Sequence, residues 1–218
     1  MTGPMVFTAA LAGVPAALQA QGVWMGRRQL FVRFSGPAET ATMYRADGLA
    51  RELDRQSAKG GFHSIAIAGS EPLANIDFLG ALLAQVTSPL PVMLDTDGAH
   101  AAGIEALAPH LDLVQVTLDL TRPNADAGRA ADALRRAAAA GCEHALVVVA
   151  QDPGDEALGR IVDQAHAASA GTQFVVHPVV AGERAPLDRR WAAIIERATA
   201  LGADARLAYR LPGPAALR

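Results

Sequence analysis

The sequence predicts an α/β protein built on parallel strands, either an incomplete open barrel or a doubly wound sheet. Strand-like and helix-like segments alternate from residue 29 onward, and several helix-like segments end at a glycine. We count about six strand–helix units, which are too few for a closed eight-stranded barrel. No linker or change of composition divides the chain, so we expect residues 1–218 to form a single domain.

The expected strands are apolar segments bounded by turn residues. Residues 29–34 alternate in polarity and carry Leu30, Val32 and Phe34 on one face. The later segments are short continuous apolar runs, which are typical of strands buried on both faces of a parallel sheet. The full set covers residues 29–34, 62–68, 91–94, 113–118, 145–150 and 173–176, with a weak last strand at 205–209.

Amphipathic segments between these strands predict the helices. They cover residues 47–59, 76–86, 99–107, 124–140, 155–170 and 187–201. A glycine follows four of these segments directly, and glycine is a common residue just past a helix end. The four are Gly60, Gly141, Gly171 and Gly202.

Composition and charge indicate an ordinary globular protein. Hydrophobic residues make up 51% of the chain, charged residues make up 19%, and the formal charge is -3. A nucleic-acid partner would require a clustered basic surface, which this balance does not suggest. We find no basic, apolar signal sequence and no apolar run near the ~18 residues of a membrane helix. We therefore expect a cytoplasmic protein without nucleic-acid or membrane partners.

Four stretches, in order, resemble the 7-carboxy-7-deazaguanine synthases, which are radical S-adenosylmethionine enzymes. They are LQAQG at residues 18–22 with GR at 26–27 and LFVRFSG at 30–36, AGSEPL at 68–73, DTDG at 95–98, and TLDL at 117–120. The family shows Q-G-E-G with G-R and F-V-R-x-x-G, T-G-G-E-P-L, E-T-N-G and S-x-D-x-K in these places. The resemblance runs through nearly the whole chain and implies an open barrel of about six parallel βα units, similar to radical S-adenosylmethionine enzymes.

The loop that carries the family's catalytic cluster departs from the pattern. The family holds a 4Fe-4S cluster through three cysteine thiolates there, whereas the matching positions in this chain are Pro37, Ala41 and Tyr44. The chain has a single cysteine, Cys142, which lies far along the sequence. Ala46 replaces the threonine that binds Mg²⁺ in the family. We therefore expect neither the iron–sulfur cluster nor Mg²⁺ or another metal.

The resemblance assigns Gly69, Ser70 and Glu71 to the turn that binds S-adenosylmethionine in the family. A glycine at a strand end lets a ligand approach the backbone closely. The alternative is that Gly69 ends a strand and Glu71 begins an ordinary loop. Both interpretations stay open at the level of sequence.

The resemblance also assigns Gln19, Gln21 and Arg27 to positions that contact substrate. An arginine can bind a carboxylate through two parallel hydrogen bonds. Gln21 replaces a family glutamate and so removes a charge. The alternative for Arg27 is an ordinary surface arginine beside Arg28.

Three acidic residues and one histidine follow predicted strands. Asp95, Asp97 and Asp119 lie at strand ends that meet at one mouth of a parallel sheet, where paired carboxylates can act as acid and base. Turn stabilisation before Gly98 is the alternative for the first two. His177 ends another strand and is either a site residue or a structural histidine.

These observations lead to two hypotheses on function. The first is a pseudoenzyme that binds S-adenosylmethionine or a purine- or pterin-like ligand, or that acts as a partner subunit, in a homodimer or in a heteromer with a homologue. The second is a repurposed enzyme that performs non-radical chemistry at the strand C-terminal mouth. An open polar mouth favours binding or catalysis, and a mouth filled by Trp24, Met43, Tyr44 and Pro37 favours a scaffold.

Overall fold

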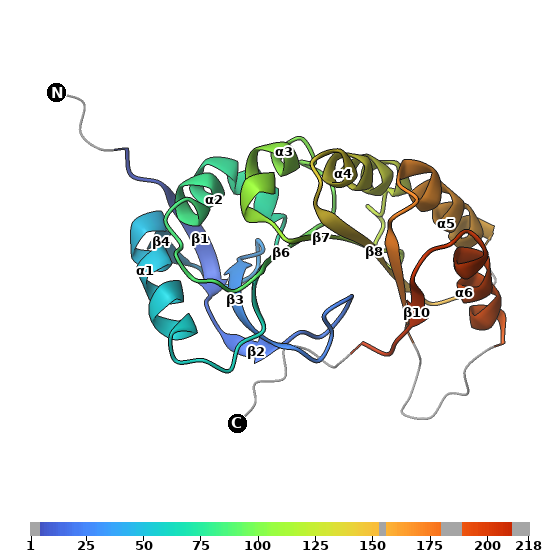
Figure 1. Cartoon of the computed structure of the whole chain (residues 1–218), viewed down its shortest axis with the longest axis horizontal. Helices are drawn as coiled ribbons and strands as arrows, with labels where there is room; N and C mark the ends of the chain where they lie inside the picture. Colours follow the sequence, from blue (N-terminus) through green and yellow to red (C-terminus); the bar gives the residue numbers. More distant parts are fainter. Residues whose placement is uncertain (1–4, 153–155, 180–188, 211–218) are drawn as a thin grey trace.

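The computed structural model describes residues 5–152, 156–179 and 189–210. Seven parallel strands follow one another in sequence order across a curved sheet that does not close (Figure 1). They are β3 (Arg28–Phe34), β5 (Ser64–Gly69), β6 (Val92–Thr96), β7 (Leu113–Asp119), β8 (Glu143–Ala150), β9 (Gln173–Pro178) and β10 (Ala205–Leu207). This order confirms the open barrel and excludes a doubly wound sheet, in which the strand order would reverse.

Three short antiparallel strands, which the sequence did not predict, complete the sheet. They are β1 (Thr8–Gly13), β2 (Ala16–Leu18) and β4 (Thr42–Arg45). β2 pairs with the first residues of β3, and β1 pairs with its last residues. β4 pairs with β1 at the edge of the sheet, so the loop expected to follow β3 contains a strand.

The helices cover the convex face of the sheet (Figure 1). They are α1 (Ala46–Ser57), α2 (Ile76–Leu83), α3 (Gly103–Leu107), α4 (Ala127–Ala139), α5 (Glu156–Ala168) and α6 (Arg190–Ala200), with short 3-10 turns at Pro72–Asn75 and Ala108–His110. Each predicted helical segment is confirmed within the described residues. No described helix is long and apolar enough to cross a membrane.

Two apolar layers enclose the sheet. The larger layer lies between the strands and the helices, and residues such as Leu30, Ile67 and Leu94 are fully buried in it. A smaller cluster lies on the concave side, where Met93 and Leu113 pack with neighbours that include Trp24. This inner cluster fills the end of the barrel at which the parallel strands begin.

A hairpin loop at residues 19–27, between β2 and β3, reaches across the concave side toward β9 and β10 (Figure 1). Its backbone amides bond to side chains of distant strands. Gly22 N donates to His177 Nε2 at 2.8 Å, and Val23 N donates to Gln115 Oε1 at 3.2 Å. These bonds provide partners for backbone amides of the hairpin that would otherwise have none. Hydrogen bonds between the hairpin and side chains of β7 and β9 therefore take the place of strand pairing on the open side of the barrel.

Replacement of Gly22 by alanine tests this closure. Gly22 has a φ of +79°, and a Cβ there would collide with the Gln115 side chain. We expect Gly22→Ala to lower the free energy of unfolding by about 3 kcal/mol, from backbone strain and overpacking together. Denaturant unfolding, monitored by circular dichroism, measures this change in the free energy of unfolding.

Gly26→Ala is the matched control, because Gly26 has a φ of +80° with open space around its Cβ position. Its cost should be backbone strain alone, about 1 kcal/mol. Equal losses in the two variants would contradict close packing of the hairpin against Gln115.

Candidate ligand-binding cavity

A cavity of about 610 Å³ opens where β3, β5, β6 and β7 end. This volume lies in the range of ligand pockets, roughly 300–1,000 Å³. The hairpin forms part of its floor through Gln19, Ala20 and Gln21. Pro37 lies on the rim, whereas Trp24, Met43 and Tyr44 do not line the cavity. The mouth is therefore open and polar, which supports the hypotheses that include a ligand.

The floor of the cavity is a buried polar cluster around Asp95. Thr117 Oγ1 donates to one Asp95 oxygen at 2.6 Å, and Gln21 Nε2 donates to the other at 3.3 Å. Burial raises the pKa of Asp95, while hydrogen bonds from Thr117 and Gln21 oppose the rise. Gln21 Oε1 is buried and has no hydrogen-bond partner among the described residues.

One wall carries a pair of carboxyl groups, Glu71 and Asp97. Glu71 accepts hydrogen bonds from Thr96 Oγ1 and from the backbone N of Asp97, each at 2.9 Å. Burial and the neighbouring Asp97 carboxyl raise the pKa of Glu71 to about 7. The pair can therefore hold or release a proton near neutral pH, and its charged form can bind a cation.

The turn before Glu71 owes its glycine to packing between strands. Gly69 has a φ of +109°, and a Cβ there would collide with the backbone of Phe34. The N–H of Ser70 bonds to the carbonyl of Phe34 at 3.2 Å, so this amide is already used. Ser70 is exposed and lines the cavity, where its hydroxyl is accessible to a ligand.

Four arginines line the mouth of the cavity. Three of them pair with an acidic neighbour, namely Arg33 with Glu39, Arg122 with Asp119 and Arg129 with Asp126. The fourth is Arg210, which has no ion pair within the described part of the chain and whose charge acts on Asp95. Exposed ion pairs contribute only about 0–1 kcal/mol. These arginines can therefore exchange an acidic partner for an anionic group of a ligand at little cost.

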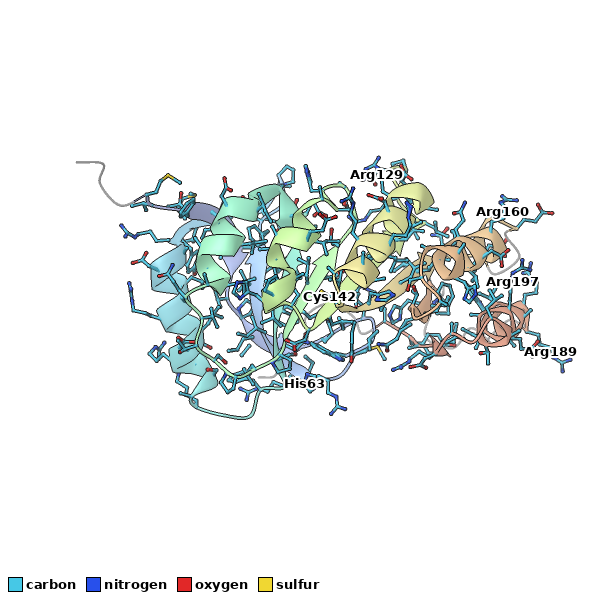
Figure 2. All side chains as sticks on the ribbon, turned by 45° about the horizontal axis from the view of Figure 1, so that its top comes forward. His63, Arg129, Cys142, Arg160, Arg189 and Arg197 are labelled. Carbon is cyan, nitrogen blue, oxygen red and sulfur yellow. The ribbon has the colours of Figure 1, made fainter. Side chains whose placement is uncertain are left out.

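The positions that hold the cluster in the family do not form a thiolate site here. Ala41 is exposed just before β4, and Tyr44 in β4 pairs with Ala9 and packs against the outer core. Cys142 is buried at the amino end of β8, at the opposite end of α4 from Arg129 (Figure 2). Among the described residues no group of three His, Cys, Asp or Glu side chains could hold a metal ion. The residues present therefore do not fit an iron–sulfur cluster.

Gln19, Arg27 and Asp119 lie in three different settings. Gln19 is buried, and its Nε2 lies 3.7 Å from the Met93 sulfur. Arg27 is exposed at the end of the hairpin and does not line the cavity. Asp119 lines the cavity and accepts a 2.6 Å bond from Thr121 Oγ1. The structure therefore brings Gln19 and Asp119 to the cavity and leaves Arg27 outside it.

His177 is fully buried below the cavity and does not line it. Its ring nitrogens lie 2.8 Å from Gly22 N and 2.6 Å from Ala208 O. Both nitrogens therefore have backbone partners within the protein.

Sequence reasoning identified Asp119 on β7 but missed Gln115 and Thr117 on the same strand and the arginines of the mouth. Gln115, Thr117 and Asp119 alternate with apolar residues along β7, and Thr117 and Asp119 line the cavity. Polar residues with a period of two in an otherwise apolar strand indicate a polar inner face. That signal was available in the sequence.

Replacement of Asp95 by asparagine tests the buried carboxyl. The raised pKa of Asp95 means that the folded protein keeps a proton that the unfolded chain loses above pH ~3.9. Stability therefore falls as pH rises through this range. We expect Asp95→Asn to gain about 1–3 kcal/mol at pH ~8 and nothing near pH ~4.

Thermal unfolding of Asp95→Asn across pH measures this gain, with Glu143→Gln, which replaces an exposed carboxyl at the amino end of β8, as the control. A loss of stability of Asp95→Asn at every pH would show that the buried carboxylate is required in its charged form.

Comparisons with known proteins agree with the motif resemblance. No protein-family model matches the chain. The 7-carboxy-7-deazaguanine synthase of Methanothermobacter thermautotrophicus is 29% identical over 136 residues, covering 56% of this chain and 54% of the relative. The synthase of Geobacter sulfurreducens is 28% identical over 143 residues, covering 51% of this chain and 57% of the relative. The chain thus spans about half the length of the curated relatives it matches. These matches support a distant family relationship between this chain and the 7-carboxy-7-deazaguanine synthases.

Proposed function

We propose that this chain is a cluster-less relative of 7-carboxy-7-deazaguanine synthase that binds a small polar ligand and does not perform the radical reaction. One observation carries the proposal. The cavity at the strand ends is open and lined by charged and polar groups, while the three cluster positions hold Pro37, Ala41 and Tyr44. The chain therefore has a cavity that can bind a ligand, but it lacks the cysteines that would hold the electron donor of the radical reaction.

The lining supports S-adenosylmethionine as the first ligand to test. Its ammonium group suits the Glu71 and Asp97 carboxyls, its carboxylate suits the arginines of the mouth, and its adenine suits the amide of Gln21. A purine- or pterin-like ligand would use the same floor through its ring N–H and C=O groups.

The second candidate function is non-radical chemistry at the same mouth. It is favoured by the Glu71 and Asp97 pair, because a pKa of Glu71 near 7 suits proton transfer at neutral pH. The other two candidate residues, His177 and Asp119, already have partners. Both ring nitrogens of His177 contact backbone groups, and Asp119 forms an ion pair with Arg122.

Incubation with S-adenosylmethionine separates the two candidate functions. Recovery of unchanged S-adenosylmethionine supports binding alone, and a new product supports an enzyme.

We include in the proposal a cytoplasmic protein that forms a homodimer or pairs with a homologue, without nucleic-acid or membrane partners. The relationship to the synthases motivates the dimer. Light scattering of the purified protein, alone and mixed with an active synthase, measures the oligomeric state. A monomer under both conditions would contradict the proposed dimer and the proposed pairing with a homologue.

Iron analysis tests the loss of the radical chemistry. Protein purified without oxygen should carry no stoichiometric iron or acid-labile sulfide, because Cys142 is buried far from the cavity. The Cys142→Ser variant should give the same result. Stoichiometric iron and sulfide in the unaltered protein would overturn the proposal.

Calorimetric titration with S-adenosylmethionine tests the binding site. We expect affinity to rise as pH increases through about 7, because Glu71 becomes charged and attracts the ammonium group. Glu71→Gln should weaken binding about tenfold at pH ~8, the scale of one charge-assisted hydrogen bond.

Two further variants define this effect. Asp97→Asn should move the pH dependence to lower pH, because Asp97 helps to raise the pKa of Glu71. Glu143→Gln, an exposed residue at the amino end of β8, is the control and should bind like the unaltered protein. If the titration shows no heat of binding at any pH, S-adenosylmethionine is not the ligand.

A further inference from the structure

His177 connects three segments that are far apart in the sequence. Its Nε2 accepts the backbone N–H of Gly22 at 2.8 Å, and its Nδ1 lies 2.6 Å from the carbonyl oxygen of Ala208. An N–H can bond only to an unprotonated nitrogen, and a carbonyl can bond only to a protonated one. The contacts therefore require a neutral ring with its proton on Nδ1.

This ring fixes the hairpin segment that forms the cavity floor. Gly22 directly follows Gln21, whose Nε2 donates to Asp95 at 3.3 Å and lies 3.4 Å from Thr117 Oγ1. The neighbouring Val23 N is held by Gln115. Loss of the bond from Gly22 would therefore free the residue beside Gln21 while His177 itself never meets the ligand.

We propose that His177 is a positioning residue of the cavity, whose neutral ring holds the hairpin in place and whose protonation releases it. The inference rests on the proposed function, because it treats the floor beside Gln21 as part of a ligand site. It adds a control of that site by pH, which acts through a residue outside it.

The surroundings of His177 keep the ring neutral. Burial lowers its pKa, the nearby positive charge of Arg210 lowers it further, and the bond to the Ala208 carbonyl opposes them. On β8 the neighbour in register is Val149, which is apolar. The hairpin that His177 holds contacts the carboxyl group of Asp95 through Gln21.

The sign of the pH effect follows. The unfolded or released ring takes up a proton below its ordinary pKa of about 6.5, whereas the held ring resists protonation. The contribution of His177 to hairpin stability is therefore complete above pH ~6.5 and is lost as pH falls below it.

Amide hydrogen exchange of the hairpin tests the proposal without a ligand. We expect His177→Phe, which keeps a ring and removes both bonds, to reduce protection of the Gly22 and Val23 amides about fivefold or more, the scale of one hydrogen bond. His177→Gln presents an oxygen near the Nε2 position and does not titrate. It should restore protection and abolish its dependence on pH.

His144→Phe is the matched control. His144 is also buried, and its ring nitrogens bond to Cys142 O and Ser169 Oγ at the other end of the sheet. Its loss should leave hairpin protection unchanged. Equal effects of the two phenylalanine variants, or no effect of His177→Phe, would overturn the proposal.

If His177→Phe does not fold, the unaltered protein provides the test. Protection of Gly22, corrected for intrinsic exchange, should drop between pH ~7.5 and pH ~5.5 while that of Ile65 in β5 persists. Protection that stays constant would overturn the proposal.

Titration of S-adenosylmethionine into the same variants separates this inference from the proposed function. If the unaltered protein binds it, His177→Phe should weaken binding, and His177→Gln should reduce the loss of affinity at low pH to the part that Glu71 causes. If the unaltered protein does not bind it, the proposed function fails for this ligand, and the exchange measurements still decide the role of His177.

Discussion

Hydrogen bonds from one hairpin replace the strand pairing that would close this barrel. The parallel strands run from β3 to β10 without meeting, and the gap is crossed by backbone amides that need partners once they are buried. His177 and Gln115 supply those partners, and both are fully buried. The same hairpin carries Gln19 and Gln21 into the cavity. Closure of the fold and the chemistry of the floor therefore depend on the same few bonds.

The sequence predicted the parallel strands well and the antiparallel ones not at all. Strands buried between two layers appear in a sequence as continuous apolar runs. Six of the seven parallel strands lie where such runs, or the alternating residues 29–34, occur, and β10 lies in the weak segment at 205–209. β1 and β2 read TAALAG and AAL. Small residues give little contrast between the two faces of a strand, so no periodic signal marks these segments. Their pairing depends on β3, which local pattern cannot reveal.

The candidate site could be located from the sequence more easily than its contacts. Strand ends and motif positions directed attention to Glu71, Asp95 and Asp97, and all three line the cavity. The bond from Gln21 to Asp95 joins residues on separate strands and loops. Such contacts depend on how the barrel curves, which periodicity does not determine. An arginine such as Arg210 likewise becomes part of the mouth only through the path of the chain after β10.

β4 has a consequence for any attempt to return this chain to its relatives' chemistry. β4 contains position 44 and begins directly after position 41, and its pairing with β1 determines which way residue 44 faces. Tyr44 already points to the outer core, opposite Ala9 in the pairing with β1. A cysteine at position 44 would face the outer core and not the cavity while β4 stays paired. Restoring the cluster site would first require the edge strand β4 to separate from β1. The backbone pairing of β4, in addition to the three substituted side chains, therefore opposes a return of the cluster.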